Sequence, residues 1–190
     1  LMPENIILLG SHLRGGVNKR INLRFNGDVG EISGHSMKHC NVIYDGKTDH
    51  SAAYNPDNCK IIFNHEAPNN CAHDARKSEI IFNGNCDYGC ASSAADSHVI
   101  FKGKTGNYCG SSAKRSLLEY FDVTGSDNAG LIIYSTAIFH STAGRMTGCH
   151  AKGSILKFNK TVGDFSCTGA ADCDIHANDL NSLGDIKSNT

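Results

Sequence analysis

The stretches that decide the fold are LRFNG at residues 23–27, VIYDG at 42–46, IIFNH at 61–65, IIFNG at 80–84 and VIFKG at 99–103. They recur with a period of 19 residues, and weaker copies follow at residues 118–122, 137–141, 156–160 and 175–179. No insertion or deletion interrupts this series. A unit this short cannot bury a hydrophobic face alone, so a fixed period of about 20 residues predicts units stacked into a solenoid.

Within each copy, the first and third residues are apolar, and the third is nearly always aromatic. The aromatic column reads Phe25, Tyr44, Phe63, Phe82, Phe101, Tyr120, Phe139 and Phe158. Alternation with period two and β-branched or aromatic content are typical of a strand. We therefore predict an all-β, single-stranded parallel β-solenoid (β-helix) of about nine 19-residue coils. At about 4.8 Å per coil, the rod is roughly 43 Å long.

This reading divides the chain into residues 9–179 as the solenoid, 1–8 as an N-terminal cap or cover, and 180–190 as a C-terminal cap or tail. Outside the strand, several columns of the repeat hold small residues, which would let the walls approach closely. One column holds Gly30, Gly106, Gly125, Gly144 and Gly163. We expect this column to form a corner with positive φ, a conformation that glycine adopts without steric cost.

The segment GDVGEISGHSMKHCNVIYDG, residues 27–46, resembles the glycine-repeat domain shared by the C-terminal part of glutamate synthase and the C subunit of formylmethanofuran dehydrogenase. The spacing of Gly27, Gly30, Gly34 and Met37 follows that family's pattern, whereas Cys40 stands where the pattern has glycine. The resemblance implies a right-handed parallel β-helix. It also implies a scaffold that holds catalytic domains or subunits in place, with no catalytic residues of its own.

Composition and motifs narrow the classes of function. The 18 Lys and Arg residues nearly balance the 19 Asp and Glu residues and are scattered along the chain, so we expect no nucleic-acid partner. No apolar run is long enough for a membrane span, and no secretory signal is evident. Phosphate-binding, dinucleotide-binding and nucleophile-elbow motifs do not occur. We therefore expect a protein that is not an enzyme, with no catalytic residues, no cofactor and no metal site.

The nine cysteines follow the repeat, and two readings of them stay open. In the first, cysteine replaces Ser or Ala as a small residue that faces inward. In the second, neighbours in a column form disulfides between coils; the candidates are Cys40, Cys59, Cys71, Cys90 and Cys109. A zinc or iron–sulfur site is disfavoured because a linear column does not converge on one point. Free thiols would suit the cytoplasm and disulfides an extracellular location.

Polar residues also form columns. His12, Glu31 and His50 are expected to stack on one outer face, and His35, Tyr54 and His73 on another, either of which could bind a metal or move a proton. Asn26, Asn64, Asn83, Asn159 and Asn178, with Asp45 among them, are expected to form a turn ladder that satisfies backbone groups after the strand. We interpret all three columns as structural.

The most informative column lies between the two core positions of the strand. It holds Ile43, Ile62, Ile81, Ile100 and, further along, Ile138. Strand alternation places these side chains on the outside, and a contiguous exposed apolar stripe usually marks a covered surface. The cover could be residues 2–9 of the same chain, a partner subunit or another copy. We predict a non-catalytic scaffold that docks a protein partner, or self-associates, through this stripe.

Two alternatives remain open at this point. A secreted ice-binding solenoid would need a regular outward array of hydroxyls; Thr48, Thr105 and Thr124 share a column, but Val29, Ala67, Cys86 and Ala143 interrupt it. A filament-forming protein would join coils end to end, because terminal coils expose unpaired strand edges.

Overall fold

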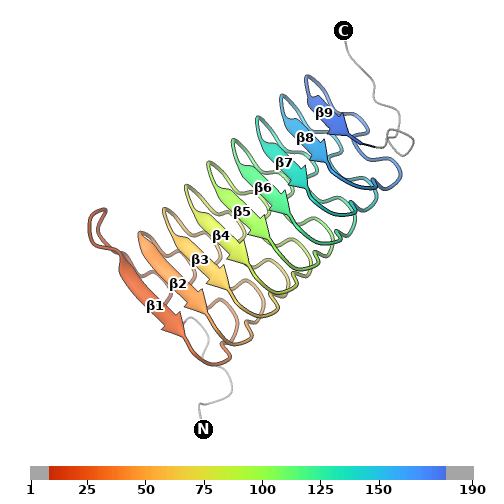
Figure 1. Cartoon of the computed structure of the whole chain (residues 1–190). Coiled ribbons are helices and arrows are strands. Elements are labelled where there is room, and N and C mark those ends of the chain that lie inside the picture. The colour runs from red at the N-terminus through yellow and green to blue at the C-terminus, as the bar shows by residue number, and fades with distance from the viewer. Residues whose placement is uncertain (1–8, 179–190) are drawn as a thin grey trace.

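The computed structural model describes residues 9–178 as a rod of stacked coils, each of which contributes one strand (Figure 1). The strands are β1 (Ile21–Phe25), β2 (Cys40–Tyr44), β3 (Lys60–Phe63), β4 (Glu79–Phe82), β5 (His98–Phe101), β6 (Leu117–Tyr120), β7 (Thr136–Phe139), β8 (Ile155–Phe158) and β9 (Asp174–Ala177). They form a single parallel sheet in chain order. The predicted β-solenoid is confirmed. The predicted caps lie outside the described residues.

The register between neighbouring strands is 19 residues throughout, as in the pairs Val42↔Ile61 and Ile61↔Ile80. Two further columns of parallel bridges run along the rod. One passes through Ala67, Cys86 and Thr105, and the other through Lys38, Asp57 and Arg76. The column through Ala67 lacks a bridge between Thr48 and Ala67 and between Thr124 and Ala143. Each coil therefore has three walls: the strands form the first, the column through Ala67 the second and the column through Lys38 the third.

The interior is built from the aromatic ladder on the first wall and small residues opposite it. Ring centroids of successive aromatics are 4.9 Å apart between Phe63 and Phe82 and 5.1 Å apart between Phe82 and Phe101, with nearly parallel planes. The β-sheet spacing thus sets the stacking distance. The Oη atom of Tyr44 donates a hydrogen bond to the carbonyl of Ser33, which satisfies the one polar atom that this ring buries.

A column of hydroxyls closes the corner before the strand. Ser97 Oγ donates to the carbonyl of Ala95 at 2.8 Å and accepts from the amide of Ser78 at 3.2 Å. The same arrangement recurs at Ser78, Ser116, Ser135 and Ser154. Each serine therefore satisfies a backbone group of its own coil and one of the coil before it, which matters because these groups are buried.

The predicted position of the left-handed corner is wrong. The glycine column that includes Gly125 and Gly144 does not have positive φ; instead, a Cβ on Gly144 would lie on the backbone of Gly125, so close approach between coils requires glycine there. Positive φ recurs four times per coil at other columns. One of these holds Gly34, Ala53, Ala72, Ala91, Gly110, Ala129, Gly148 and Cys167, which face the aromatic ladder and must be small.

The first coil is longer than the rest. Arg14 pairs with Lys38 across 24 residues, whereas Lys38 pairs with Asp57 across 19. The five extra residues lie in a short hairpin closed by the bridge between Gly16 and Lys19. Residues 9–14 therefore stand five positions out of the 19-residue register assumed from the sequence, which changes the neighbours of every side chain in that segment.

None of the secondary structure within residues 9–178 is a helix long and apolar enough to cross a membrane.

Candidate interaction face

The predicted isoleucine stripe lies on the outer side of the first wall. Ile43, Ile62, Ile81 and Ile100 stand in register on β2 to β5, and each is partly exposed between two buried neighbours on its strand. We call these four residues the isoleucine face. Val42, Ile61, Ile80 and Val99 and the aromatics already fill the interior, so the core does not require the four isoleucines.

Polar columns flank the isoleucine face on both sides. On one side, Lys60 Nζ lies 2.9 Å from Glu79 Oε2. On the other side, Asn64 Nδ2 donates to Asp45 Oδ1 and Asn83 Nδ2 donates to Asn64 Oδ1, each at 2.7 Å. The predicted asparagine ladder therefore exists here, but its side chains bond to one another along the rod.

Backbone amides are instead satisfied by other Asx residues one coil earlier. Asp28 accepts from the amide of Lys47 at 2.8 Å, Asn85 from that of Lys104 at 3.0 Å, and Asn107 from that of Ser126 at 2.8 Å. In the predicted column itself, Asn178 Nδ2 donates to the backbone carbonyl of Asn159 at 3.0 Å, so the prediction that this column satisfies the backbone holds there.

Charged residues end the isoleucine face. At β1, Arg24 occupies the isoleucine column and forms an ion pair with Asp45, whose pKa this hydrogen bond holds below its ordinary value. At β6, Glu119 occupies the same column and separates the face from Ile138. The face is thus an apolar strip with a cation at one end and an anion at the other.

Sequence reasoning did not find the cluster around Glu119. Its carboxylate lies 2.8 Å from His98 Nε2 on β5 and 3.5 Å from His140 Nε2, which directly follows β7. The His140 ring also stacks on Phe121, with centroids 4.3 Å apart. The signal was available, because Glu119 lies 21 residues from each histidine and Phe121 lies 19 residues from His140, which places them on neighbouring coils.

All nine cysteines are free thiols in this structure, and eight of them are buried. The reading of cysteine as a small inward residue is confirmed for those eight. Cys71, Cys90 and Cys109 form one column, and each thiol donates to a carbonyl of the preceding coil, those of Asp49, Pro68 and Asp87. The structure records these cysteines as free, and disulfides between coils stay a prediction.

Burial also decides the chemistry of the remaining candidate thiols. Cys59 Sγ donates to the carbonyl of Asp57, and Cys40 Sγ to that of Lys38. Both thiols thus make the same bond as the serines that occupy this column in the following coils. Loss of solvent raises the pKa of Cys59 to about 11 and that of Cys71 well above its ordinary value. The thiolate forms of these cysteines are therefore disfavoured. Because the thiolate is the reactive form, their reactivity is low as well.

One predicted histidine column is present and one is not. The rings of His35, Tyr54 and His73 stack with centroids 5.5 and 5.2 Å apart. Tyr54 donates to Asp74 at 2.8 Å, and this bond raises the pKa of Tyr54. The column of His12, Glu31 and His50 is wrong: the extra residues of the first coil move His12 to a position 5.4 Å from the His35 ring.

Within residues 9–178, no three His, Cys, Asp or Glu side chains are placed to hold a metal ion. The threonine column also faces inward, since Thr48, Thr105 and Thr124 are all buried. It therefore offers no outward hydroxyl array.

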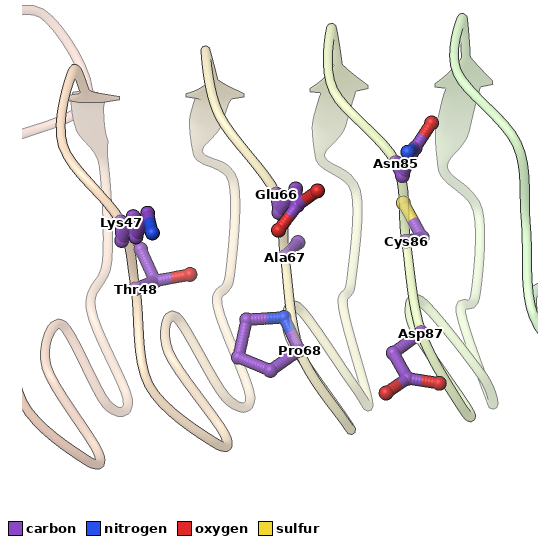
Figure 2. A pocket seen from close by; sticks show the side chains of 8 residues that line it. All are labelled: Lys47, Thr48, Glu66, Ala67, Pro68, Asn85, Cys86 and Asp87. Carbon is purple, nitrogen blue, oxygen red and sulfur yellow. The ribbon is translucent and has the colours of Figure 1, made fainter.

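A groove of about 320 Å³ opens on the second wall, where Figure 2 shows Thr48, Ala67 and Cys86 at equivalent places on three successive coils. Its cause is Pro68, which has no amide hydrogen and so cannot bond to the Thr48 carbonyl as Asp87 does to that of Ala67. The proline thus interrupts the ladder between these two coils.

A larger hollow of about 600 Å³ lies on the third wall around Ala95. Its acids are engaged, Asp57 by Lys38, Asp74 by Tyr54, and Asp96 by a two-pronged bond from Arg115. Its cations Arg76, Lys77 and Lys114 form no ion pair with any described residue, and together with Arg115 they outnumber the three carboxylates of the lining by one.

Comparisons with known protein families, with curated proteins and with solved structures found no match to this chain, so its sequence and geometry carry the functional argument.

Proposed function

We propose that this solenoid is a non-catalytic interaction module that docks a protein through the isoleucine face. The observation that carries the proposal is the set of four isoleucines in register on the outside of the first wall, at positions that the core does not use. Covering them would remove further apolar area from water, at roughly 25 cal/mol per Å². The resemblance to the glycine-repeat scaffold domains supports the same role.

The shape of the face suits docking. Parallel strands with a constant 19-residue register present side chains in straight columns, so a partner meets an even surface. The hydrogen-bonded ladder from Asp45 to Asn83 and the Lys60–Glu79 pair give the strip a polar rim. An apolar centre with a polar rim is the usual anatomy of a protein interface.

The ice-binding alternative loses its candidate array, because Thr48, Thr105 and Thr124 face the interior. End-to-end assembly into filaments stays a prediction, since the chain ends lie outside the described residues.

The test is native mass spectrometry of the protein purified from its source, wild type against the double variant Ile62→Lys with Ile81→Lys. The proposal predicts that the wild type carries a protein partner, of its own or another sequence, in fixed stoichiometry and that the double variant loses it. Leu131→Lys is the matched control, because Leu131 is an exposed apolar residue (56% exposed) away from this face. A wild-type protein that is a monomer, or a partner retained by the double variant, would sink the proposal.

A further inference from the structure

The charges around the isoleucine face are arranged about its midpoint, which lies between β3 and β4. Each charge has an opposite charge at the same distance on the other side of this midpoint. In the central column, the order from β1 to β6 is Arg24, Ile43, Ile62, Ile81, Ile100 and Glu119. Reading this column backwards and reversing the sign of each charge returns the same pattern. The cation at one end therefore lies as far from the midpoint as the anion at the other.

Both flanking columns obey the same rule. In the column before the isoleucines, Lys60 on β3 and Glu79 on β4 are equidistant from the midpoint and opposite in charge. In the column after the isoleucines, Asp45 follows β2 and Lys102 follows β5. These two residues are again equidistant from the midpoint and opposite in charge. The other outward positions of these columns between β1 and β6 hold no Lys, Arg, Asp or Glu.

A surface of this kind is complementary to itself under one two-fold rotation. The axis lies in the plane of the face, parallel to the strands, and passes between Ile62 and Ile81. Rotation about it places a second rod face to face with the first and running the opposite way. Ile62 then meets Ile81 of the second copy, and Ile43 meets Ile100. The three opposed charge pairs are Arg24 with Glu119, Lys60 with Glu79, and Asp45 with Lys102.

The other two-fold rotation that brings the faces together is disfavoured. With its axis along the rod, each residue of the central column meets its own copy, so Arg24 faces Arg24 and Glu119 faces Glu119. Like charges held opposite each other at an interface oppose association and help to exclude a wrong register. The charge pattern therefore selects the antiparallel arrangement.

We propose that the partner of the isoleucine face is a second copy of this chain, in an antiparallel face-to-face dimer centred between β3 and β4. The inference rests on the proposed function and names its partner. Two sheets packed this way lie about 10 Å apart with their strands nearly aligned, and a two-fold interface uses the same patch on both subunits.

The overlap predicts a dimer that dissociates on dilution. Six strands at about 4.8 Å and four residues at about 3.3 Å make a contact of roughly 29 by 13 Å on each copy. That footprint, about 380 Å² on each copy, is below the standard size of stable interfaces and is typical of a weak, transient contact. Parts of the rod beyond β6 extend past the second copy and stay uncovered.

The decisive experiment mixes two charge-reversed variants, Lys60→Glu and Glu79→Lys. In a dimer of either variant alone, residues 60 and 79 carry the same charge. Two like-charged pairs then face each other, one on each side of the axis. Mixed, one copy carries two glutamates and the other two lysines, so both contacts become attractive. We expect sedimentation equilibrium at low salt to show a dimer dissociation constant raised about tenfold for each variant alone. Mixing the two should restore dimerisation.

Rescue on mixing separates the contact between copies from the ion pair within one chain, because neither variant regains its own Lys60–Glu79 pair. The control Lys104→Glu makes the same charge change away from the face and should leave dimerisation unchanged. Failure of mixing to rescue, or a wild type that is monomeric at high concentration, overturns the dimer. If Ile62→Lys with Ile81→Lys still releases a different protein in the native complex, the proposed function survives that failure.

Discussion

The requirement for glycine at the corner after each strand can be tested by adding a single methyl group there. Gly103→Ala would place a Cβ 2.6 Å from both the carbonyl carbon and the oxygen of Gly84, one coil earlier. Gly27→Ala is the matched control: Gly27 occupies the same place in the first repeat, and its added Cβ meets nothing within 4 Å. The two substitutions are chemically identical, so their difference reports only the stacking of one coil on another.

The magnitude follows from the spacing of the coils. Ordinary contact begins near 3.4 Å, so the corner must move by about 0.8 Å, which is 3.4 minus 2.6. The nearby bonds from Cys86 N to Lys104 O, at 2.8 Å, and from Lys104 N to Asn85 Oδ1, at 3.0 Å, would lengthen beyond useful distance. Losing one or two bonds costs about 1–3 kcal/mol, partly offset by the about 0.4–1 kcal/mol that alanine contributes by restricting the unfolded chain.

Urea unfolding followed by far-ultraviolet circular dichroism measures this difference. We expect Gly103→Ala to lower the free energy of unfolding by about 1–2 kcal/mol, equivalent to roughly 2–8 °C in Tm for a chain of this size. Gly27→Ala should be neutral or slightly stabilising. Equal effects from the two variants would refute the argument that the backbone of the preceding coil requires glycine at this corner.

Three further outcomes are expected. Ser97→Ala removes the acceptor for the buried Ser78 amide, so the free energy of unfolding should fall by about 1–3 kcal/mol; Ser97→Cys, which copies the cysteines of the same column, should lose less. The pKa of Asp96 is lowered by Arg115, so the contribution of this pair is present above the ordinary Asp pKa and lost as pH falls through the lower folded value. Arg115→Ala should therefore raise the Asp96 pKa in an NMR titration, and an unchanged value would contradict the pairing. With a thiol reagent, Cys173 should react first and the eight buried cysteines only on unfolding; fast reaction of several thiols in the native protein would contradict their burial.

The repeat predicts most of the fold because each coil packs equivalent residues at equivalent positions. The alternation of Val42 and Tyr44 with Ile43 was enough to place the first two inside and the third outside, since strand side chains alternate. The sequence predicts the wrong column for the positive-φ corner because two different physical demands both select small residues. Gly144 avoids the backbone of the preceding coil, whereas Ala91 adopts positive φ opposite the aromatic ladder.

The ends and outer surfaces required the structure. The extra residues before Lys19 carry no mark in the repeat, so only their pairing shows that the His12 ring lies beside the His35 ring. The inward direction of Thr48 and the meeting of His98 with Glu119 likewise depend on how one coil bends.

By itself, the sequence determined the strand, the 19-residue period and the outward isoleucines, because hydrophobic alternation is a local property that repeats. Tertiary structure alone decided which charges surround those isoleucines and at what distance from the midpoint. The reason is that Arg24, Lys60, Glu79 and Glu119 become neighbours only when coils stack in register, and stacking turns sequence separation into position along the rod.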